Sequence, residues 1–135
     1  MRNLPIALRH EIIKTFAAPI MKESAILQKQ DFVFIKSEYK FVKIKFDDIL
    51  FCKGMKDYIQ VYIIGKSKPV ITLKSLNVFE TKLPQDKFIR VHRSYIVSLL
   101  HIDTISKNEI SIGKQIVPIG SIFKPDFFTI VELNS

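Results

Sequence analysis

From Asp31 onward, apolar and polar residues alternate in short runs that are separated by turn-forming residues, a pattern typical of β-strands. In residues 41–46, for example, Val42 and Ile44 alternate with Lys43 and Lys45, so one face of this segment is predicted to be buried. Further strands are predicted over residues 33–36, 49–52, 58–64, 70–73, 88–91, 102–106, 109–112 and 115–119. Since proline cannot donate to a strand ladder, Pro118 predicts an edge position for the last strand.

One short helix interrupts the β pattern. Ser75 is the candidate N-cap, Leu76, Phe79 and Leu83 would share one face, and Pro84 would end the helix. We expect it to cover an open sheet. The apolar tail over residues 121–133 is expected to pack back onto the same domain.

Residues 1–30 differ from the rest because they lack β alternation. Leu8, Ile12 and Phe16 follow helical spacing, and Pro19 should end or kink the helix. The pattern predicts two parts: a helical or linker segment over residues 1–30 and a mainly β domain over residues 31–135.

The charge and the cysteine content of the chain limit the partners and the cellular compartment that we expect. The chain has 21 Lys and Arg against 13 Asp and Glu, a net charge of +8, which favours polyanionic partners but also fits a domain that is simply basic. The single cysteine, Cys52, cannot form an intramolecular disulfide and is expected to fill the core. No apolar run approaches the roughly 20 residues that span a bilayer, and the N-terminus does not resemble a secretion signal. We therefore expect a cytoplasmic protein without a membrane partner.

The run 88–97 carries the clearest functional signal, because Arg90, His92 and Arg93 interrupt an otherwise apolar, strand-like stretch. Charges there cost desolvation energy unless they emerge at a surface with an anionic partner. The alternative is a solvated strand end whose charges only keep an edge soluble.

Catalytic and metal-binding patterns are not found. His10, His92 and His101 have no metal-ligand spacing with one another or with Cys52. The adjacent carboxylates of Asp47 and Asp48 are better explained as a turn. Four glycines cannot build a phosphate-binding loop, so we expect neither an enzyme nor a cofactor.

Several linked segments in a fixed order resemble the LytTR-type DNA-binding domain found at the C-terminus of many bacterial response regulators. The resemblance covers about residues 32–128 and rests on segments 47–51, 54–59, 72–76, 82–84 and, above all, 88–97. It implies an elongated antiparallel β-fold of several small sheets with one short helix, which inserts loops into successive DNA grooves.

The resemblance also implies the contact residues. They are the loop Lys56, Asp57 and Tyr58, then the histidine motif with His92 and Arg93, and the loop over residues 120–122 with Ser121. Arg93 is suited to read guanine through two parallel hydrogen bonds, whereas Arg90 and Lys74 are expected to contact phosphate. Tyr58 begins an alternating face and could equally be a packing residue.

Two positions depart from the family pattern. Cys52 stands where an acidic residue is common, and Ser121 stands where a basic residue often contacts DNA. A serine lacks long-range attraction, so contact by this third loop is in question unless Lys124 compensates.

The sequence therefore predicts a bacterial transcription regulator that binds specific double-stranded DNA, as the output part of a two-component response regulator. Partners would be DNA, a second copy on repeated sites and, if the chain is a fragment, an upstream receiver domain or sensor kinase, because 30 residues cannot hold a receiver. Alternatives are a basic protein-interaction or scaffold module and an RNA-binding β-domain. RNA binding would need exposed aromatic residues, whereas these are interpreted mostly as core: Phe32, Phe34, Phe41, Phe46 and Phe51.

Overall fold

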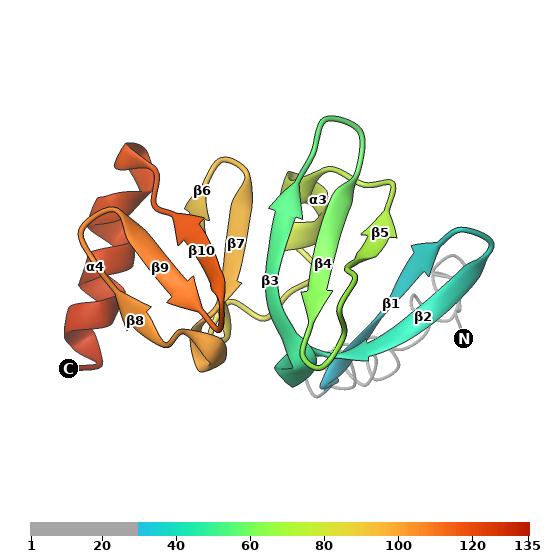
Figure 1. Cartoon of the computed structure of the whole chain (residues 1–135), viewed down its shortest axis with the longest axis horizontal. Helices are drawn as coiled ribbons and strands as arrows, with labels where there is room; N and C mark the ends of the chain where they lie inside the picture. The colour runs from blue at the N-terminus through green and yellow to red at the C-terminus, as the bar shows by residue number, and fades with distance from the viewer. Residues whose placement is uncertain (1–29) are drawn as a thin grey trace, which may run out of the picture. The chain divides into compact units, whose positions relative to one another are not determined.

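The computed structural model describes residues 30–135, and within them the chain forms antiparallel β-sheets of two, five and three strands (Figure 1). The expected mainly β class with several small antiparallel sheets and a short helix is confirmed. The N-terminal helical segment predicted over residues 1–30 lies outside the described residues, Gln30 excepted. The strands are β1 (Phe32–Ser37), β2 (Lys40–Lys45), β3 (Ile49–Gly54), β4 (Ile59–Ile63), β5 (Val70–Thr72), β6 (Phe88–His92), β7 (Tyr95–Ser98), β8 (Thr104–Ile105), β9 (Glu109–Ile112) and β10 (Gln115–Pro118).

The five-stranded sheet, in the order β5-β4-β3-β7-β6, separates two hydrophobic cores. Because successive side chains of a strand point to opposite faces, Phe51 and Cys52 of β3 enter different cores, as do Val97 and Ile96 of β7. Cys52 is completely buried, as expected of a core residue, and burial raises the pKa of its thiol far above the usual range. One sheet thus organises most of the apolar residues of the domain.

The first core lies between this sheet, the β1–β2 hairpin and helix α3 (Leu76–Glu80). Ser75 caps the helix as predicted, because its side chain accepts a hydrogen bond from the Val78 N–H at 3.2 Å. The helix ends earlier than Pro84 indicates, since Thr81 is already its C-cap and the Thr81 hydroxyl donates to the Val78 carbonyl at 2.6 Å. Leu83 lies beyond the helix and is nevertheless buried.

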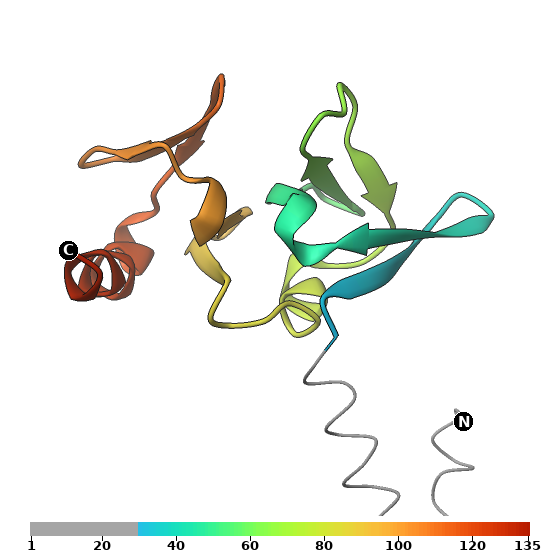
Figure 2. The same cartoon turned by 90° about the horizontal axis from the view of Figure 1, so that it is seen from below.

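The second core includes the three-stranded sheet β10-β9-β8 and helix α4 (Lys124–Leu133). In Figure 2 the red helix and the orange strands lie on two sides of the space that these side chains fill. Phe127 of α4 is fully buried, so the tail packs back as expected, in a helical form that was not predicted. Strand β10 is an edge strand, which confirms the position inferred from Pro118.

Aromatic residues of the β1–β2 hairpin require a correction. Phe46 and Phe51 are buried as expected, but Phe34 and Phe41 are 58% and 67% exposed. Phe32 is half-buried, with the Lys43 ammonium 4.3 Å from its ring centre. The reason is geometric: a two-stranded sheet with a core on one face leaves its other face in water. The prediction that these rings lie in the core is therefore wrong for Phe34 and Phe41.

Candidate nucleic-acid interface

The motif over residues 88–97 folds as a hairpin in which Arg93 and Ser94 connect β6 to β7. Strand β7 was not predicted as a separate strand, because the apolar run continues through the turn. An irregularity of register between Arg90 and His92 bends the strand just before the turn. As a result Arg93 is exposed at the tip of the turn, while Ile96 and Val97 return to the cores.

The guanidinium of Arg90 holds this turn from inside. Its Nε donates to the His92 carbonyl at 2.8 Å and its Nη2 donates to the Arg93 carbonyl at 2.6 Å. Its Nη1 donates to Asn77 Oδ1 at 3.0 Å and to Glu80 Oε1 at 2.8 Å, which ties the turn to helix α3. Since a guanidinium has five donors, Arg90 has little capacity left for an external partner.

His92 supports the same turn with its ring. Its Nδ1 accepts a hydrogen bond from the Ser94 N–H at 3.0 Å, and the ring packs edge-on to Tyr95 at 5.5 Å between centroids. The pKa of His92 is lowered by burial and, to a lesser degree, by the positive charges of Arg93 and Arg90. These influences favour the neutral ring, which leaves Nδ1 free to accept.

The loop between β3 and β4 lies beside this turn. The Gly54 N–H donates to the Ser94 carbonyl at 2.8 Å, and the Met55 N–H closes the loop by donating to the Tyr58 carbonyl at 2.8 Å. This arrangement exposes Lys56 and Asp57 at the tip and leaves Tyr58 half-buried. Tyr58 therefore keeps both roles open, packing and contact.

The segment after β10 approaches from the other side of the turn. The Gly120 N–H donates to the Val91 carbonyl at 2.8 Å. A Cβ atom at Gly120 would lie 3.2 Å from the Phe123 ring and 3.5 Å from the Cα of His92, so glycine permits the close approach. The short 3-10 helix that follows, Ser121–Phe123, presents Ser121 and Ile122 to solvent.

These three segments form one continuous surface, the loop surface, defined here as Lys56–Tyr58, the β6–β7 turn and residues 120–122. In Figure 1 the three segments lie together at the upper edge of the domain, with the turn in the middle. The connection between β5 and α3, which carries exposed Lys74, reaches the same edge. The sequence-predicted residues are thus brought together, although they come from distant parts of the chain.

Lys124 is placed differently from the exposed cations. It is the first residue of α4, and its Nζ donates a hydrogen bond to Asn108 Oδ1. The backbone carbonyl of Asn108 also accepts a hydrogen bond from the Ile119 N–H at 2.9 Å. This arrangement ties the β8–β9 connection to the segment after β10. It brings in Lys107 and Asn108, which sequence reasoning missed because a polar turn carries no distinctive signal.

Exposed apolar side chains are a second feature that sequence reasoning missed. Ile122 is 86% exposed on the loop surface and Leu73, next to Lys74, is 80% exposed. Their exposure to water is unfavourable, because apolar surface is stabilised when it is removed from water. Together with the exposed cations Lys56, Lys74 and Arg93, they fit a partner that offers both charge and apolar contacts, as a DNA groove does through phosphates and thymine methyl groups.

Within residues 30–135, no group of three or more His, Cys, Asp or Glu side chains is placed to hold a metal ion. None of the helices in this part of the chain has the length and apolar character needed to cross a membrane.

Fold and site together define a small β-domain that presents a cationic surface made of loops. The family model of the LytTr DNA-binding domain matches residues 39–130, and the chain belongs to this family of DNA-binding, non-catalytic domains. Among solved structures, one described as the LytTr DNA-binding domain of a methyl-accepting/DNA response regulator from Bacillus cereus has the same fold. Its TM-score is 0.65 at 24% sequence identity, covering 76% of this chain and 97% of that chain. No curated protein matches the sequence.

Proposed function

We propose that this chain binds specific sequences of double-stranded DNA through its loop surface and regulates transcription in the cytoplasm. Membership of a DNA-binding family supports DNA as the partner. The observation that carries the proposal is the exposure of Arg93 at the centre of three segments that backbone hydrogen bonds hold together. A rigid frame around one free guanidinium is what reading a base edge requires.

The residues have different parts in this proposal. Arg93 reads a base, while Lys56, Lys74 and the neighbouring exposed cations contact phosphates and fix the position of the domain. Asp57, Tyr58 and Ser121 would contribute neutral or orienting contacts at the edges. Arg90 and His92 are better interpreted as positioning residues, because their polar atoms are engaged within the turn. Lys124 acts through Asn108 in the same sense.

The domain would work as the output part of a two-component response regulator. A receiver domain or sensor kinase would then supply the signal, and two copies would occupy repeated sites. The similar Bacillus cereus domain is described as part of a response regulator, which supports this context.

Arg93→Ala is the direct test of the proposed reading residue. Bound sequences are first selected from a random duplex pool, and affinity is then measured on the selected and on a scrambled duplex. Because a bidentate contact to guanine is lost, we expect a loss of about 1–3 kcal/mol on the selected site and relaxed preference at one base pair. Lys114→Ala, in the exposed β9–β10 turn, also removes one positive charge. It should change neither the affinity for the selected site nor the base preference. Equal losses on both duplexes would show that Arg93 only positions the domain.

A further inference from the structure

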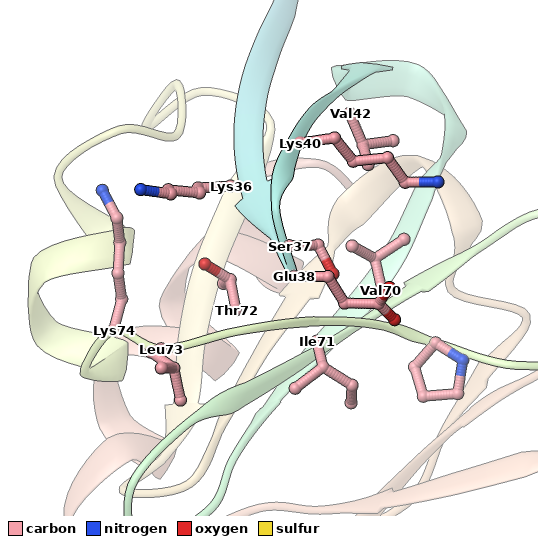
Figure 3. A pocket seen from close by; sticks show the side chains of 11 residues that line it. Lys36, Ser37, Glu38, Lys40, Val42, Val70, Ile71, Thr72, Leu73 and Lys74 are labelled. Atoms are coloured by element: carbon pink, nitrogen blue, oxygen red, sulfur yellow. The ribbon is translucent and has the colours of Figure 1, made fainter.

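A cavity of about 600 Å³ lies between the β1–β2 hairpin and β5 (Figure 3). Its size falls within the range of about 300–1,000 Å³ that is typical of small-molecule sites. None of the residues that define the loop surface lines it, but Lys74, proposed above to contact DNA phosphates, does. Strand β5 is an edge strand of the five-stranded sheet, so no other strand of residues 30–135 fills this space.

One end of the cavity is cationic and carries an unused hydroxyl. Figure 3 shows the ammonium ends of Lys36 and Lys74 on the same side as the hydroxyl oxygen of Thr72. Neither lysine forms an ion pair with another residue of the described chain. Thr72 is only 3% exposed, yet its hydroxyl has no hydrogen-bond partner among residues 30–135. A buried hydroxyl without a protein partner is free to donate a hydrogen bond to a water or to a ligand atom in the cavity.

The rest of the cavity is lined by apolar side chains together with Ser37, Glu38 and Lys40. Val42 and Val70 form its wall, and the Glu38 side chain points toward Val70, away from the two ammonium groups. Glu38 has a backbone φ of 59°, a left-handed conformation that favours glycine and is strained for a residue with a side chain. The two-residue turn between β1 and β2 requires this conformation, and it places the Glu38 carboxylate in the lining of the cavity.

We propose that this cavity binds a small organic phosphate. The phosphate group would lie between Lys36 and Lys74 and accept a hydrogen bond from the Thr72 hydroxyl. The organic body would pack on Val42 and Val70 and donate a hydrogen bond to Glu38. The phosphates of a DNA backbone fit less well, because a duplex would leave the apolar wall of Val42 and Val70 unfilled.

The test is an amide-shift titration of the ¹⁵N-labelled full chain by NMR. Adenosine 5′-monophosphate and phenyl phosphate are the probes, inorganic phosphate is the head-only control and adenosine is the body-only control. We expect shifts in residues 36–42 and 69–74, and at least tenfold tighter binding of one organic phosphate than of either control. If both organic phosphates bind no tighter than inorganic phosphate, the proposal fails.

Variants then assign the contacts. Lys36 is not among the predicted DNA contacts. Lys36→Ala should lower the affinity for the organic phosphate at least tenfold, whereas Lys114→Ala should leave this affinity unchanged. Thr72→Val removes the hydroxyl but keeps the shape and should weaken binding, while Thr72→Ser should retain it, so a failure of the valine variant to fold leaves the serine variant informative. Equal effects of Lys36→Ala and Lys114→Ala would indicate non-specific attraction and overturn the site.

Glu38→Gly separates a ligand contact from a structural role. Glycine relieves the backbone strain, so the urea midpoint should rise, while the affinity for the organic phosphate should fall at least threefold. A variant that is more stable and binds equally well would remove Glu38 from the site. If a short random duplex shifts the same amides and the organic phosphates do not, the lysines belong to a DNA-backbone contact and the proposal is wrong.

Discussion

Two arginines three positions apart in one motif have opposite surroundings. Arg93 is exposed, whereas the side chain of Arg90 is 15% exposed and bonds to two backbone carbonyls, Asn77 and Glu80. A guanidinium so far from water is tolerated because its donors are satisfied. The sequence could not distinguish the two residues, since the bend between Arg90 and His92 decides which of them faces solvent.

Arg90→Lys tests whether Arg90 positions the turn or contacts phosphate. Lysine keeps the charge but cannot make planar, forked hydrogen bonds to the turn and to α3. If Arg90 positions Arg93, the variant should have a lower melting temperature. Its affinity for the selected site should fall at least tenfold, which is roughly 1.4 kcal/mol. The salt dependence of binding should stay unchanged. If Arg90 contacts phosphate, lysine should replace it with little loss on any duplex. Duplex titrations at several salt concentrations distinguish the two outcomes.

His92 makes the stability of the turn depend on pH. Its pKa in the folded chain is below the unfolded value of about 6.5, so the unfolded state binds the proton first as pH falls. The stability that His92 contributes is complete above about pH 6.5 and is lost as pH falls through the folded pKa. Protonation also removes the acceptor at Nδ1 for the Ser94 N–H.

His92→Asn is the matched variant for this prediction, because its side-chain oxygen retains an acceptor near Nδ1 and does not titrate. Urea unfolding at pH 7.5 and at pH 5 should show a smaller loss of stability in the variant than in the unchanged chain. An identical pH dependence in both proteins would assign it to groups other than His92.

At the scale of elements, alternation predicted strands such as β2 because they have one face in a core, whereas β3 and β7 have a core on each face. The period of two in residues 41–46 and the cap at Ser75 are local signals, and both are confirmed. Strand β7 was missed because Arg93 and Ser94 form a turn without glycine or proline. Helix α4 was not predicted, although Phe127, Ile130 and Val131 repeat at helical spacing. The loop surface depends on backbone bonds between distant segments, which no local pattern records.

Ser121→Arg tests whether the segment after β10 reaches DNA. Ser121 is exposed on the loop surface, and Gly120 fixes its backbone to β6. If the segment enters a groove, an arginine there should strengthen binding and steepen the salt dependence by up to about one phosphate equivalent. Lys107→Ala, in the neighbouring turn, should have the opposite effect: weaker DNA binding and a shallower salt dependence. Unchanged affinity and unchanged salt dependence would exclude Ser121 from the interface.

For the whole molecule, the net charge of +8 does not by itself choose between partners. The exposed Phe34 and Phe41 remove one argument against RNA, because bases stack on exposed rings. These rings lie on the β1–β2 hairpin, however, and not among the segments that frame Arg93. Duplex DNA and single-stranded RNA should therefore use different faces.

Salt dependence and two sets of variants test this division of faces. Binding to the duplex through about three phosphates should give a log–log slope near −3 and a loss of about 50-fold between 50 and 200 mM salt, because counterions are released. Replacing Phe34 and Phe41 by Ser should leave duplex binding intact, whereas Lys56→Ala should lower the slope by about one. If the serine variants abolish binding and single-stranded RNA competes better than the duplex, the hairpin is the nucleic-acid site. A slope near zero would instead favour an acidic protein as the partner of this basic surface.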